Sequence, residues 1–157
     1  MSETRTIPAA ATDAEAASQF LMLVVLGLQA LAVNGKQAHW NVRGENFVAI
    51  HELIDTIVGN AQTGADHAAE RIVALGLPID ARVGTVAAKT ATRVAAGFTQ
   101  WDGCVRALIA DIDVVIGDTQ VAIDGLDGVS LPSQDVAIGI MRMLEKDRWF
   151  LFAHLAE

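Results

Sequence analysis

The feature that most constrains the fold is a helical spacing of apolar residues along nearly the whole chain. Apolar residues recur three and four positions apart in long segments, and no segment shows the alternation typical of a strand. The segments run over about residues 13–40, 46–75, 91–123 and 132–155, separated by short stretches rich in glycine and proline. We therefore predict an all-α protein, a four-helix bundle over residues 13–157. One or two further helical turns over residues 81–88 are expected in the crossover between the second and third helices.

Length and composition indicate a single-domain protein without a membrane segment. The 157 residues suffice for one domain with its own core, and 52% of them are hydrophobic, a surplus that an oligomer interface would cover. Residues 1–12 are small and polar, so we expect a flexible N-terminal arm. The longest apolar run, Phe20–Val33, holds 14 residues, whereas a membrane span needs about 18. No membrane segment is expected, and the single cysteine, Cys104, favours a reducing, cytoplasmic location.

Four titratable side chains share one face of the second predicted helix. His51 and Asp55 are four residues apart, as are Asp66 and Glu70, so each pair spans one turn. Taken singly, Asp55 and Glu70 are better explained as solvated charges than as metal ligands. The two pairs are separated by about 16 Å along the helix, because Asp66 lies 11 positions after Asp55. One chain therefore cannot bring all four side chains to one metal.

The two pairs are, however, symmetric about one point. The midpoint between residues 55 and 66 is 60.5, and that between 51 and 70 is the same. A second copy laid antiparallel across this point would bring each His/Asp pair against the partner's Asp/Glu pair, as the self-complementary interface of a two-fold dimer requires. His39, one loop upstream, could complete each site. Two histidines and three carboxylates suit iron, manganese or zinc.

The same residues carry a family resemblance. The stretch KQAHWNVRGENFVAIHELID (Lys36–Asp55), followed by DHAAERIVALG (Asp66–Gly76), resembles the Dps family, the ferritin-like mini-ferritins of starved bacteria. The family signature is a histidine, a second one 12 residues later, an aspartate four further on, and Asp-x-x-x-Glu eleven beyond that aspartate. His39, His51, Asp55, Asp66 and Glu70 match it. The ending LEKDRWFLFAH (Leu144–His154) is also similar to the last helix of the family.

The resemblance implies a hollow dodecamer built from two-fold dimers, with a ferroxidase site at each dimer interface. His39, His51 and Asp55 would come from one subunit, and Asp66 and Glu70 from its neighbour. Hydrogen peroxide, or less readily dioxygen, would oxidise paired Fe(II), and ferric mineral would collect in the cavity, which stores iron and limits oxidative damage.

Three further positions match the family. Trp40 corresponds to a tryptophan beside the site, where it either intercepts oxidising equivalents or simply packs. Lys36 corresponds to a position near the site, with no role assigned. Asp135 looks like a residue lining a pore through which iron enters, although an acidic residue in the first turn of a helix is also favoured by the helix dipole.

The charge pattern departs from the family's name. Residues 1–17 contain Arg5 as their one basic side chain, and the formal net charge is −8. Because DNA affinity rests mainly on neutralising phosphates, we expect DNA binding to be weak or absent.

Iron oxidation and storage is the leading interpretation, and two alternatives stay open. The first is a DNA-compacting protein without catalysis. The second is a metal-dependent hydrolase of amide bonds, with Glu52 of the His51-Glu52-x-x-Asp55 stretch as its base. Glu52 lies about 100° from the face that carries the predicted ligands.

Overall fold

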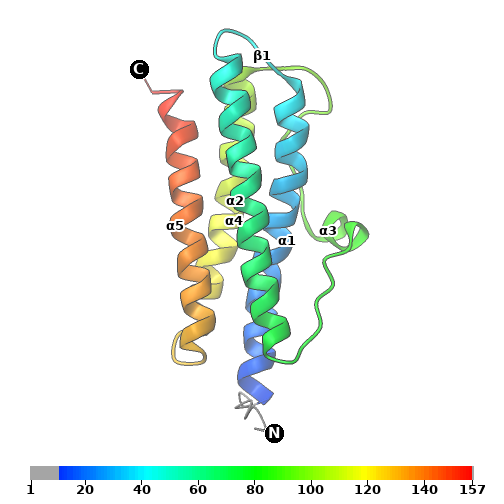
Figure 1. Cartoon of the computed structure of the whole chain (residues 1–157), viewed down its shortest axis with the longest axis vertical. Coiled ribbons are helices and arrows are strands. Elements are labelled where there is room, and N and C mark those ends of the chain that lie inside the picture. The colour runs from blue at the N-terminus through cyan, green and yellow to red at the C-terminus, as the bar shows by residue number, and fades with distance from the viewer. Residues whose placement is uncertain (1–10, 157) are drawn as a thin grey trace, which may run out of the picture.

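Four long helices form an antiparallel bundle, and a short helix stands beside it (Figure 1). The computed structural model describes residues 11–156, with side chains from residue 13 onward. Within this range the elements are α1 (Ala11–Asn41), β1 (Val42–Arg43), α2 (Phe47–Ala74), α3 (Val83–Lys89), β2 (Thr99–Gln100), α4 (Trp101–Leu126) and α5 (Leu131–Ala153). The order and type of the helices confirm the predicted all-α fold with a short helix between the second and third long helices.

The connections determine the topology. Residues 42–46 turn α1 into α2, and residues 127–130 turn α4 into α5, whereas residues 75–100 run back along the bundle and carry α3 (Figure 1). One long crossover in a four-helix bundle is the arrangement of ferritin-like folds. Gly44 permits the first turn because its φ is +115°, a conformation that side-chain-bearing residues rarely adopt.

The core is continuous and almost wholly apolar. The largest fully buried side chains come from all four long helices: Leu21, Val24, Leu28, Ile50, Ile54, Ile57, Ile72, Leu108, Ile112, Leu126, Leu144 and Leu151. The α1 helix over Asp13–Asn41 is long and apolar enough to cross a membrane, and 56% of its most apolar stretch is buried inside the bundle. The apolar surface of α1 therefore serves as core.

The start of the third long helix was predicted wrongly. The spacing placed it near Ala91, but α4 begins at Trp101, ten residues later. The intervening segment is held in a non-helical conformation because the buried carboxylate of Asp111 accepts hydrogen bonds from the Thr92 hydroxyl (2.5 Å) and the Arg93 amide (2.9 Å). Such side-chain bonds offer the backbone an alternative to the helix.

The same segment contributes a short ladder that no alternating pattern predicted. Thr99 and Gln100 pair in parallel with Val42 and Arg43, which follow the end of α1. At the other end of the chain, α1 includes residues 11 and 12 and begins two residues before the predicted Asp13. The rest of the predicted arm, residues 1–10, lies outside the described residues.

Candidate metal centre

Two histidines from different helices form a reciprocal pair. His39 lies in the last turn of α1 and His51 lies early in α2, on either side of the tight turn. Nδ1 of His39 is 2.7 Å from the carbonyl oxygen of His51, and Nδ1 of His51 is 2.8 Å from the carbonyl oxygen of His39. The rings stack with their centroids 3.6 Å apart. Each histidine therefore holds the other in place.

This pairing also completes the end of α1. The last four carbonyls of a helix lack partners within it, and the carbonyl of His39 is one of them. The imidazole of His51 donates to that carbonyl and so caps the helix through a side chain. The local fold of the turn and the orientation of the two rings depend on the same hydrogen bonds.

The hydrogen bonds also determine which ring nitrogen is protonated. A carbonyl oxygen can only accept, so Nδ1 of each ring must carry the hydrogen. In the neutral imidazoles, the Nε2 nitrogens of His39 and His51 then keep their lone pairs. Donation of one ring N–H to a backbone carbonyl is the usual arrangement of histidines that bind a metal through the other nitrogen. The pair fits a divalent metal ion.

Asp55 lies one turn beyond His51 and is paired with a lysine. The ammonium of Lys36, on α1, donates a hydrogen bond to Oδ1 of Asp55, and both side chains remain partly exposed. This contact lowers the pKa of the Asp55 carboxyl below its ordinary value. Asp55 is therefore ionised, and the lysine supplies a cation at the carboxylate. The sequence pattern gave no indication of this ion pair.

Asp66 and Glu70 lie further along α2, away from the histidines. Both are exposed, and they line an open groove with Val73 and Ile79. Within residues 11–156 of a single chain, no three His, Cys, Asp or Glu side chains converge on one point. One chain thus brings together the two histidines but leaves the acidic pair apart, and a complete site made by two chains stays a prediction.

The remaining predicted residues are accessible. Trp40 follows His39 directly, and 67% of its surface is exposed. Asp135 was predicted in the first turn of a helix, but α5 begins at Leu131, so Asp135 lies just beyond the first turn; it lines a groove between α2 and α5 with His67 and Arg142. Glu52 is exposed on α2. None of these positions contacts the histidine pair by a hydrogen bond in the described part of the chain.

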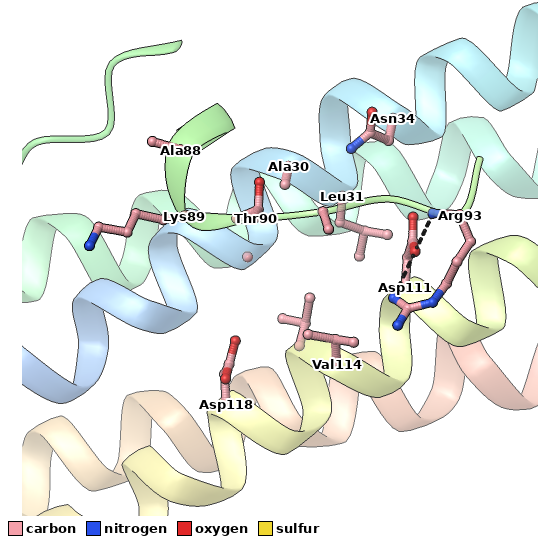
Figure 2. Close-up of a pocket in the computed structure, with 13 residues that line it drawn as sticks. Ala30, Leu31, Asn34, Ala88, Lys89, Thr90, Arg93, Asp111, Val114 and Asp118 are labelled. Atoms are coloured by element: carbon pink, nitrogen blue, oxygen red, sulfur yellow. Dashed lines mark hydrogen bonds and ion pairs between the residues drawn. The ribbon is translucent and has the colours of Figure 1, made fainter. Parts of the chain in front are cut away.

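A further cavity lies between α1, residues 88–93 and α4 (Figure 2). The ion pair of Arg93 and Asp111 forms one end, and Asp118 lies two turns along α4. Partial burial raises the pKa of the Asp118 carboxyl. The cavity contains none of the residues that the sequence predicted for the metal site.

Comparisons with known proteins agree with this architecture. A family model described as a ferritin-like domain matches residues 26–157. A solved structure of Dps from Microbacterium arborescens, in a high iron form, is 64% identical to this chain. It aligns with a TM-score of 0.94 over 95% of this chain and 98% of its own. The chain belongs to the Dps family.

Curated relatives of this Dps-family chain carry the name DNA protection during starvation protein. The relative from Agrobacterium fabrum is 34% identical over 132 residues, which cover 81% of this chain and 80% of the relative. The relative from Mycolicibacterium smegmatis is 39% identical over 124 residues, which cover 76% of this chain and 66% of the relative. The match thus spans just under two thirds of the length of the second relative.

Proposed function

We propose that this protein oxidises Fe(II) with hydrogen peroxide, or less readily with dioxygen, at sites shared between two subunits. The ferric product is stored inside a hollow dodecamer, in the cytoplasm, and the cell is thereby protected from oxidative damage. The observation that carries the proposal is the reciprocal histidine pair, which leaves two Nε2 lone pairs free. Membership of the Dps family and the symmetric position of the acidic pair on α2 support it.

The donor set suits iron as the substrate. His39 and His51 are neutral donors, so they bind Fe(II) without adding charge to the site. Asp55, with Asp66 and Glu70 of the partner subunit, supplies hard anionic oxygens, which stabilise Fe(III) more than Fe(II). The protein thereby favours the product of oxidation over the substrate.

The pairing of two irons limits the damage that peroxide can do. Two Fe(II) ions supply the two electrons that convert one hydrogen peroxide and two protons into two water molecules. A single Fe(II) would supply one electron and release a hydroxyl radical. Carboxylates from two subunits that face one another would keep the two irons close enough to react together.

Stopped-flow absorbance of the ferric product, after anaerobic Fe(II) loading and addition of hydrogen peroxide, tests the proposal. We expect rapid oxidation by the wild-type assembly and slow oxidation after His51→Ala or Asp66→Ala. His154→Ala is the matched control, because this histidine lies at the end of α5, outside the predicted ligand set. Oxidation by His51→Ala and Asp66→Ala at the wild-type rate would remove the ferroxidase proposal.

We further infer weak or absent DNA binding, in contrast to the name of the relatives. The formal charge of −8 and the single arginine among residues 1–17 offer little to a phosphate backbone. Electrophoresis of linear DNA with the intact assembly at about 150 mM salt checks this inference. A retarded DNA band under these conditions would contradict it.

A further inference from the structure

The segment that precedes α4 braces the end of α1 that carries His39. It is fixed first by Asp111, which is only 6% exposed and accepts hydrogen bonds from Thr92 and Arg93. Figure 2 shows the contact between Arg93 and Asp111. From there the chain runs over the same end of the bundle as the turn between α1 and α2 (Figure 1). The brace, residues 92–100, therefore begins at an anchor inside the bundle and ends beside residues 42 and 43, in the turn between α1 and α2.

Three separate contacts join the brace to residues 37–43. Nε2 of Gln37 donates to the carbonyl oxygens of Ala96 (3.0 Å) and Ala95 (3.4 Å). The β1–β2 ladder pairs residues 42 and 43 with residues 99 and 100. The guanidinium of Arg43 lies 3.2 Å from the centre of the Phe98 ring, a cation–π contact.

Of the residues that contact the brace, Gln37 is the nearest to His39 in sequence. It precedes His39 by two residues and lies just before the last turn of α1, the part of a helix that frays most readily. Its own carbonyl oxygen accepts a hydrogen bond from the Asn41 side chain at 2.8 Å. Gln37 thus holds the final turn of α1 through its backbone carbonyl and holds the brace through its side chain.

The position of this turn decides the geometry of both histidines. The His51 ring is oriented by the backbone carbonyl of His39, and the His39 ring is carried by the same residue. A shift of the turn would move two ligand nitrogens at once. Groups that orient ligands usually change metal affinity when they are removed.

We propose that Gln37 is a positioning residue for the metal centre, which fixes the His39–His51 pair by joining the end of α1 to the brace. The inference rests on the proposed metal site and names a residue outside the predicted ligand set. Gln37 itself does not touch the metal.

Co(II) binding to the assembled protein tests this role, because Co(II) reports both affinity and coordination geometry through its visible spectrum and does not require turnover. The variant is Gln37→Met, which keeps the length of the side chain and removes the N–H donor. Its matched control is Gln134→Met, since Nε2 of Gln134 donates to the Ile123 carbonyl at 3.0 Å at the opposite end of the bundle (Figure 1). We expect Gln37→Met to weaken Co(II) binding about ten-fold, the lower end of the range for groups that orient ligands, and to change the spectrum. Gln134→Met should lower the thermal stability by a similar amount but leave both the Co(II) affinity and the spectrum unchanged.

Gln37→Glu separates positioning from charge. The added carboxylate would attract a cation, whereas the lost donor and the repulsion from the Ala96 carbonyl would release the brace. We expect weaker Co(II) binding than in the wild type despite the added negative charge. Wild-type affinity and spectrum in Gln37→Met, or tighter binding in Gln37→Glu, would overturn the positioning role. Wild-type protein without any His51-dependent Co(II) spectrum would instead overturn the metal site itself.

Discussion

Replacement of Asp111 by alanine should release the segment before α4. The carboxylate of Asp111 is buried and accepts hydrogen bonds from the Thr92 hydroxyl, the Arg93 amide and, at 3.4 Å, the Arg93 guanidinium. Hydrogen bonds to a charged group contribute about 1.5–3 kcal/mol each. Both donor residues are exposed and regain water once released, so we expect Asp111→Ala to lower the free energy of unfolding by about 2–3 kcal/mol in total.

The matched control is Asp113→Ala on the same helix. Asp113 also pairs with an arginine, Arg148, but both side chains are substantially exposed. An exposed ion pair contributes about 0–1 kcal/mol, so this variant should lose little. Unfolding midpoints are compared at equal protomer concentration, because subunit association contributes to the stability of an assembly.

Hydrogen exchange localises the effect. The Arg93 amide donates to Asp111, so it is protected although the Arg93 side chain is 52% exposed. In Asp111→Ala we expect this amide to exchange at the rate of an exposed amide, whereas amides in the interior of α2, which open only by global unfolding, should keep most of their protection and exchange faster by about 30- to 100-fold, the factor that the loss of unfolding free energy sets. Equal losses in Asp111→Ala and Asp113→Ala, together with unchanged exchange at Arg93, would refute the assignment of Asp111 as the anchor.

Three other substitutions have defined outcomes. Lys36→Met should tighten Zn(II) binding in calorimetric titrations, because the ammonium no longer competes for the carboxylate of the site; weaker binding would contradict the ion pair as a competitor. Burial raises the pKa of Asp147, so its ionisation costs stability above the pKa of the unfolded chain. Asp147→Asn should therefore raise the thermal midpoint at pH 8, by an amount that shrinks as the pH falls towards 4; a gain independent of pH would argue against this cause. Gly44→Ala should cost about 1–3 kcal/mol in denaturant unfolding, since a Cβ would lie 2.9 Å from Cδ1 of Trp101 at a positive φ. Gly117→Ala, with no atom within 4 Å of a Cβ, should cost nothing from contact.

The sequence was sufficient for most of the fold because helical periodicity is a local property. The apolar spacing in α1, α2 and α5 predicted their extents to within a few residues. The third long helix was extended too far because Val94 and Phe98 continue its apolar spacing. Phe98 is 67% exposed and lies against Arg43 rather than in the core. The carboxylate of Asp111, 18 and 19 positions away in sequence, holds this segment in a non-helical conformation. Periodicity carries no information about such a contact.

For the candidate site too, the sequence predicted what lies along one helix and missed the contacts between helices. Spacing on one helix predicted that His51 and Asp55 share a face, and symmetry predicted that the acidic pair belongs to a second copy. The reciprocal hydrogen bonds between His39 and His51 depend on the turn that brings two helices together, so spacing could not reveal them. The pairing of Lys36 with Asp55 likewise joins two helices across 19 positions of sequence.

The most direct test of a site shared between subunits is complementation between two inactive variants. His51→Ala removes the histidine half, and Glu70→Ala removes the acidic half. If the halves come from different subunits, a mixed dimer contains one site with both halves intact. Random mixing of equal amounts, by co-expression, makes about half of the dimers mixed and restores about one quarter of the wild-type ferroxidase sites. Stopped-flow oxidation of Fe(II) by hydrogen peroxide should therefore recover to about one quarter of the wild-type amplitude. A mixture no more active than its two parents would contradict the shared site.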